Sequence, residues 1–277
     1  MNDYDEARVD QAPADEPRYV QPGDDAEAMW SDVPELEPPI EESGAEHVSE
    51  LWRGAWMVKW AVNLFVVVVL VSILVGAVAG ATAASGGRGG AGGAPMILVL
   101  QIATNILTVA ALVLGLMGWW KLSRPDPVLG SEAQAEGMRK FARIAIGFYA
   151  AVATVQAAAS VALLATGGGG GSSGGTAAVS ALGTLVLAFM LATLVALALH
   201  FVSAMLYVRR LAPRIGDRYV YDRALTLSWL NPLLSTFGLV LLGLGPLIAL
   251  VLYYKLIARV GRSLRDASEI AAGAEPA

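Results

Sequence analysis

The chain has 277 residues, of which 56% are hydrophobic, and it carries a formal net charge of −5 and no cysteine. The lack of cysteine excludes disulfides, thiolate zinc sites, iron–sulfur clusters and a cysteine nucleophile. Residues 1–50 hold 16 acidic and two basic residues, whereas the remaining 227 residues hold eight acidic and 17 basic ones. The small net charge is therefore a cancellation between an acidic segment and a basic remainder.

Residues 1–50 are predicted to form a disordered acidic tail. They contain six of the 13 prolines and few large apolar residues. Such a composition buries too little apolar surface to offset the entropy lost on ordering. The segment also lacks the basic start and early apolar run of a signal peptide, so we expect it to remain attached.

Residues 51–260 are predicted to form an all-α, polytopic membrane domain. A bilayer core of about 30 Å is crossed by about 20 apolar residues, and long apolar blocks of at least that length recur here. We expect a bundle of six membrane helices in three hairpins. Their approximate bounds are 57–82, 96–120, 141–166, 177–208, 225–242 and 245–260.

Glycine marks the first helix and two connections. Gly76 and Gly80 form a GxxxG spacing, which indicates either a close helix–helix contact or ordinary glycine usage near the end of a span. The glycine-rich segments 83–95 and 167–175 are predicted to be flexible linkers. Neither has the lysine followed by Ser or Thr that a P-loop requires, so a nucleotide site is not expected there.

The last apolar block, residues 225–260, is predicted to be two helices. As one helix its 36 residues would be about 54 Å long, which exceeds the bilayer core. The sequence Gly243-Leu244-Gly245-Pro246 offers a break near its middle. Each half is at the lower limit of spanning length, so the hairpin either crosses fully or is re-entrant.

Lys and Arg gather at alternate ends of the blocks. After residue 51, only Arg88 falls in a connection predicted to be external. Because positive charge is retained on the cytoplasmic side, we expect both termini to be cytoplasmic.

The richness in Ala, Gly, Val and Leu suits a bacterial inner membrane. The cations at that face are expected to attract anionic lipid, and the acidic tail is expected to compete for them.

The helices predicted to return to the cytoplasm end alike, with aromatic residues before cations. These residues are Trp119, Trp120 and Lys121, then Tyr207, Arg209 and Arg210, then Tyr253, Tyr254 and Lys255. The pattern indicates either an internal repeat or interfacial anchors. We favour anchors, because the spacing between the endings is unequal.

Two further helical features carry expectations. The alanine-rich third helix, 141–166, is expected to lie near the bundle centre because its small surface allows close packing. Residues 261–277 are predicted to be a cytoplasmic amphipathic extension, because Ile257, Val260, Leu264 and Ala267 recur at helical spacing. That extension lies on anionic lipid, pairs with another helix or frays.

Polar residues are rare inside the predicted spans. No Asp or Glu occurs there, which argues against a carboxylate-based proton carrier and an intramembrane aspartyl protease. Gln101, Asn105, Gln156 and His200 are the candidate polar residues for a bundle contact or a solute path. For Gln101, Asn105 and His200, interhelical hydrogen bonding is the favoured interpretation.

No catalytic, cofactor or metal signature is found, and nucleic acid is not an expected partner. We therefore expect a non-enzymatic scaffold or regulatory protein that acts through its basic face and acidic tail. Its expected partners are the bilayer, anionic lipids, and a protein or a second copy of the chain. The alternative is a small transporter or channel subunit, which requires the four polar residues to face one cavity.

Overall fold

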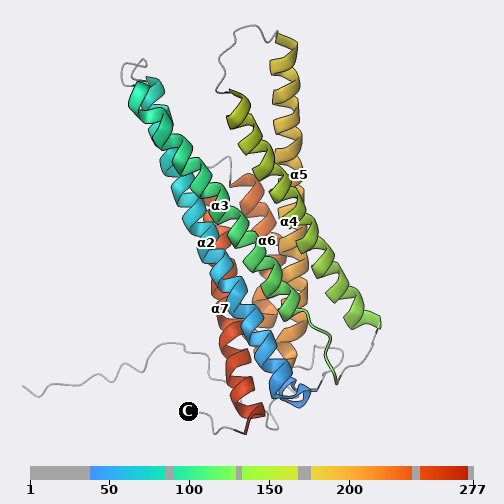
Figure 1. Cartoon of the computed structure of the whole chain (residues 1–277). Coiled ribbons are helices and arrows are strands. Elements are labelled where there is room, and N and C mark those ends of the chain that lie inside the picture. Colours follow the sequence, from blue (N-terminus) through green and yellow to red (C-terminus); the bar gives the residue numbers. More distant parts are fainter. Residues whose placement is uncertain (1–37, 85–89, 129–132, 168–175, 239–243, 274–277) are drawn as a thin grey trace, which may run out of the picture.

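A computed structural model describes residues 38–84, 90–128, 133–167, 176–238 and 244–273. These residues form helices joined by short connections, packed alongside one another as a bundle (Figure 1). In chain order the helices are the 3-10 helix η1 (Ile40–Ser43), α2 (Ala45–Ala84), α3 (Gly90–Leu122), α4 (Ala133–Gly167), α5 (Thr176–Arg214), α6 (Arg218–Phe237) and α7 (Leu244–Ala271). The part of the chain that the structure describes is therefore all-helical, as predicted.

Five helices, α2, α3, α4, α5 and α7, are long and apolar enough to cross a membrane. Large apolar side chains such as Ile106, Ile144 and Val195 lie exposed on their surfaces, as lipid contact would require. The sixth predicted span, 225–242, corresponds to α6. That helix begins in the polar sequence at Arg218, ends at Phe237, and is not among the five. Among the described residues, five helices suit membrane insertion, and the sixth predicted span is not one of them.

The helices α6 and α7 form a short antiparallel hairpin, which confirms that the last apolar block is divided. The backbones of Gly238 and Gly245 touch, and a Cβ atom on either glycine would overlap the other. Pro246 lies in the first turn of α7, where a missing N–H costs little. In Figure 1 the facing ends of α6 and α7 lie part way along the bundle, short of the far ends of α2 to α5.

The two ends of the described chain meet at one end of the bundle. Ile40 and Val48 share a buried core with Leu264 and Ala267. We call this the basic end, because Lys121, Arg124, Arg214 and Arg259 lie there. The apolar face of the last turns of α7 therefore packs on α2 and η1 of the same chain. Of the three alternatives for the C-terminal extension, this is pairing with another helix.

The last part of the segment predicted to be a disordered tail, residues 1–50, is helical in the structure. The described chain starts at Pro38, and Ile40, Val48 and Leu51 are buried. The acidic residues around these apolar positions obscured their helical spacing. Residues 1–37 lie outside the described residues, as do 85–89, which include Arg88, and 168–175 of the two predicted glycine-rich linkers. Because α3 begins at Gly90, the first connection is shorter than expected.

Of the two alternatives for Gly76 and Gly80, a close helix–helix contact is not seen in the described bundle, since a Cβ atom built on either glycine meets nothing within 4 Å. The close crossing is made instead by Gly54 of α2 and Gly118 of α3. A Cβ atom on Gly54 would lie 2.6 Å from the backbone nitrogen of Leu122. Two glycines from different helices thus allow α2 and α3 to touch, a pairing that spacing along one helix does not reveal.

The alanine-rich helix α4 lies at the edge of the bundle, not at its centre. It packs against α5 and, less extensively, α3. Its buried residues, Ala142, Ala145 and Ile146, lie near its start, whereas Ala151 and Ala158 are exposed. Small side chains permit close packing without determining that a helix is surrounded.

Candidate functional site

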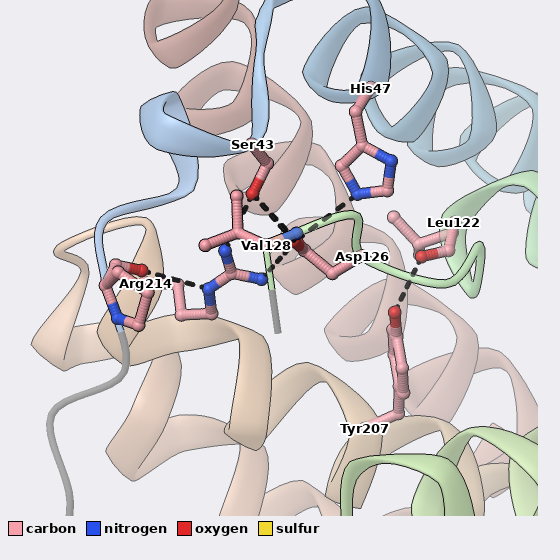
Figure 2. Close-up of polar contacts among 8 residues, drawn as sticks. Ser43, His47, Leu122, Asp126, Val128, Tyr207 and Arg214 are labelled. Carbon is pink, nitrogen blue, oxygen red and sulfur yellow. Dashed lines mark hydrogen bonds and ion pairs between the residues drawn. The ribbon is translucent and has the colours of Figure 1, made fainter. Parts of the chain in front are cut away.

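A buried polar cluster ties three separate segments together at the basic end (Figure 2). Arg214, in the last turn of α5, donates from Nη1 to Asp126 Oδ2 over 2.5 Å and from Nη2 to Ser43 Oγ over 2.8 Å. Its Nε donates to the carbonyl oxygen of Pro38 over 3.1 Å. Arg214 therefore joins the start of the described chain, the connection after α3, and the end of α5.

Asp126 is the anionic centre of this cluster. Its carboxylate accepts from Ser43 Oγ at 2.8 and 3.0 Å and from the backbone N–H of Val128 at 2.8 Å. His47 Nε2 lies 3.4 Å from Oδ2. The Asp126 and Arg214 side chains are 10% and 5% exposed, so both charges are held by partners and not by bulk water.

The protonation of Asp126 is set by two opposing effects. Burial by itself raises the pKa of its carboxyl group, but hydrogen bonds from Arg214, Ser43 and the backbone of Val128 outweigh burial. The net result is a pKa below the ordinary value of 3.8. The carboxylate is therefore charged at neutral pH and ready to hold the Arg214 guanidinium.

A lowered carboxyl pKa makes the contribution of Asp126 pH-dependent in a known direction. The stabilisation is present above the ordinary pKa and is lost as pH falls through the folded-state value, below about pH 4. We expect Asp126→Asn to lower the melting temperature at pH 7 and the difference from wild type to shrink below about pH 4. Melting in detergent across this range measures it; a difference independent of pH would contradict the charge assignment.

Other acidic residues form ion pairs with Lys and Arg side chains at the same end of the bundle. Glu50 Oε2 lies 2.5 Å from Lys121 Nζ and 3.6 Å from Arg124 Nη1. Asp217 caps the start of α6 through the N–H of Val220 and accepts from Arg259 Nε over 2.6 Å. Several cations expected to meet lipid or the acidic tail are thus paired within the bundle.

An aromatic cluster surrounds His200 in the bundle interior. Tyr149 stacks on its ring at a centroid distance of 5.5 Å, while Trp119 and Tyr253 approach at 6.2 and 6.1 Å. Trp119 Nε1 donates to the hydroxyl of Tyr253 over 3.0 Å in a buried hydrogen bond. Helices α3, α4, α5 and α7 therefore all contribute rings to one place.

A cavity of about 190 Å³ opens beside this cluster. All six long helices contribute to its lining, which is mainly apolar. Its polar edge includes His200 and Ser235, whose Nδ1 and Oγ atoms have no hydrogen-bond partner among the described residues.

The four candidate polar residues do not converge on this cavity. His200 lines it, but Gln101, Asn105 and Gln156 are not among the lining residues. Gln156 is exposed on α4, and its Oε1 accepts from Thr193 of α5 over 2.7 Å, which is an interhelical contact. Asn105 is half-buried on α3, and its Nδ2 lacks a partner among the described residues. Gln101, one turn earlier, is half-buried.

The predicted anchors divide into two groups. Trp119 and Tyr253 are each 2% exposed and face the bundle interior, so they do not lie where an interfacial anchor would. Tyr207 likewise points inward and donates to the carbonyl oxygen of Leu122 over 2.8 Å (Figure 2). Within an aromatic pair, sequence does not reveal which ring faces the core.

The remaining predicted anchors lie nearer the surface. Trp120 is exposed and stacks under the guanidinium of Arg143 at 4.3 Å. The half-buried side chain of Arg209 donates to the hydroxyl of Tyr221 over 2.9 Å. The others in this group are Lys121, Arg210, Tyr254 and Lys255, which are half-buried or exposed.

The cluster of Ser43, His47, Asp126 and Arg214 was not predicted from the sequence. One feature of the sequence could have indicated it: Asp126 is one of only eight acidic residues after residue 50, and it lies in a segment rich in cations. Ser43 and His47 gave no signal once their segment was taken as disordered.

Comparison of the chain with protein-family models, with curated proteins and with solved structures finds no match. A functional assignment must therefore rest on the geometry of the chain itself.

Proposed function

We propose that this chain is a non-enzymatic, multi-pass membrane protein that holds its acidic N-terminal segment at a fixed point and presents it to a protein partner. One observation carries the proposal: Arg214 binds both Pro38 and Ser43, the first described residues after the acidic segment. The residues that follow the acidic segment are thereby held at the basic end by hydrogen bonds from a buried arginine, which is itself ion-paired with Asp126.

The charge distribution supports a basic partner. Residues 1–37 contain 12 acidic and two basic residues, a net charge of −10. Within the bundle, Lys121 and Arg259 already have acidic partners in Glu50 and Asp217. These pairs reduce the competition from the bundle's own cations, and long-range attraction would steer the acidic segment to a positively charged surface on another molecule. The charge rule predicts that this end of the bundle faces the cytoplasm. The richness in Ala, Gly, Val and Leu suits a bacterial inner membrane.

Co-purification from native membranes in mild detergent tests this proposal. Three forms are compared: the full chain, a chain lacking residues 2–30, and a full-length chain whose acidic residues before Pro38 are replaced by Asn and Gln. We expect a protein with a basic surface to be retained by the full chain, lost from both variants, and weakened by salt as exposed charge pairs are screened. Equal retention by all three forms, or no retained protein, would overturn the proposal.

The second candidate is a small transporter or channel subunit. The observation in its favour is that His200 lines a cavity reached by all six long helices. We prefer the first candidate, because Gln101, Asn105 and Gln156 do not join His200 there. Solute flux into vesicles that is lost on His200→Phe but kept on Gln156→Leu would favour transport instead.

A further inference from the structure

The cavity beside His200 is a consequence of the short α6–α7 hairpin. Ser235 lies near the end of α6, and Pro246 and Leu250 lie in the first two turns of α7. All three line the cavity, so it extends to the facing ends of α6 and α7. Helices α2 to α5 continue past these ends (Figure 1). The hairpin thus fills the bundle at the basic end and leaves a cavity at these ends.

The cavity is large enough for a molecule bigger than water. Its volume is about 190 Å³. An apolar protein cavity of about 150 Å³ accommodates a benzene-sized molecule. The apolar part of the wall, exemplified by Phe65, Leu112 and Leu250, suits a ring or a short length of hydrocarbon chain.

Unpaired polar atoms occur on two residues that line the cavity, Ser235 and His200, and on Asn231, which does not line it. Ser235 is 3% exposed, and its Oγ has no partner among the described residues. Asn231, one helical turn earlier on the same face of α6, is fully buried, and neither its Nδ2 nor its Oδ1 has a partner in this part of the chain. The same holds for Nδ1 of His200. A buried polar group without a partner costs about 1–3 kcal/mol, so these atoms favour a bound polar group.

The residues that line the cavity also restrict the charge of a molecule that could bind there. No Lys, Arg, Asp or Glu side chain lines the cavity in the described structure. An ionised group placed there would lose its hydration without gaining a counter-charge. By contrast, a hydroxyl or carbonyl group can exchange hydrogen bonds with Ser235 Oγ and His200 Nδ1. Trp119 already donates its N–H to the Tyr253 oxygen, so its contribution to the wall is mainly ring surface.

We infer that this cavity binds a neutral amphiphile from the bilayer, with its hydrocarbon body against the apolar wall and a terminal hydroxyl or carbonyl group at Ser235 and His200. This binding site is separate from the polar cluster that holds the acidic segment. It does not depend on the function proposed for that segment.

Photolabelling of the full chain in phosphatidylcholine vesicles tests the inference. The probe is a long-chain alcohol that carries a diazirine near its hydroxyl end. The controls are the alkane and the carboxylate with the same chain and diazirine. We expect the alcohol to label peptides that line the cavity. We expect about fivefold weaker labelling by the alkane, equivalent to a hydrogen bond of about 1 kcal/mol, and weak labelling by the carboxylate.

Two matched substitutions on α4 separate cavity binding from contact with the outer surface. Ala150 lines the cavity, whereas its neighbour Ala151 is exposed and is not a lining residue. Ala150→Leu is expected to abolish cavity labelling, and Ala151→Leu to leave it unchanged. Ser235→Ala is expected to lower labelling by the alcohol to the level of the alkane.

Thermal melting in detergent identifies which variants are folded, and only folded variants are compared. Labelling confined to outward-facing residues would overturn the inference, as would equal labelling of Ala150→Leu and Ala151→Leu. Equal labelling by the alcohol and the alkane, unchanged by Ser235→Ala, would also overturn it, because recognition of a polar group would then be absent.

Discussion

Replacing Arg214 by methionine is expected to lower the free energy of unfolding by about 3–5 kcal/mol, because it leaves the buried carboxylate of Asp126 without its cation. It also removes the hydrogen bonds to Pro38 and Ser43, so the start of the described chain should detach from α5. Denaturant unfolding in detergent measures the loss of stability, and hydrogen exchange around Ser43 measures the detachment.

The control is Arg262→Met, which removes a cation from an exposed position on α7 and is expected to change stability by less than about 1 kcal/mol. A double variant, Arg214→Met with Asp126→Leu, removes both buried charges. We expect it to be more stable than Arg214→Met alone, since no uncompensated charge remains. If Arg214→Met unfolds like Arg262→Met, the buried ion pair does not hold this end of the bundle.

Replacing Gly54 by alanine is expected to destabilise the bundle by about 1–3 kcal/mol, although alanine is ordinarily the better helix former. The added Cβ would lie 2.6 Å from the backbone nitrogen of Leu122 and 2.7 Å from the carbonyl oxygen of Gly118. Both contacts are with backbone atoms, so α2 and α3 must move apart. Thermal unfolding in detergent is the measurement.

Gly76→Ala provides a matched control on the same helix. A Cβ atom at Gly76 meets nothing within 4 Å, so the substitution should cost no stability and benefit from the higher helix propensity of alanine. The two substitutions are therefore expected to act in opposite directions. A loss at Gly76 as large as that at Gly54 would contradict the position of the α2–α3 crossing.

The elements that could be predicted are those governed by hydrophobic length and period. The division of the last apolar block followed from a length that no single span requires, and the structure places the break between Phe237 and Leu244. The burial of Ile257, Val260, Leu264 and Ala267 followed from their helical spacing. Both features are local in sequence, so one chain suffices to detect them.

The features that were missed depend on contacts between distant segments. The partner of Gly54 is Gly118, and Asp126 meets Arg214 and Ser43, so no local pattern marks either site. Predictions from the average composition of a segment also failed. The many acidic residues before residue 50 predicted disorder for a segment in which Ile40 is buried. The alanines of α4 predicted a central helix, but α4 lies at the edge of the bundle.

Both proposals require the segment before α2 and the end of α7 to lie on the same side of the membrane. The chain contains no native cysteine, so single cysteines can be introduced at Glu42 and Ala272 and labelled in intact cells with a membrane-impermeant maleimide. The shared core of Ile40 and Leu264 predicts the same result at both positions, and the charge rule predicts protection until the cells are permeabilised. Labelling of one position and protection of the other would contradict the hairpin architecture.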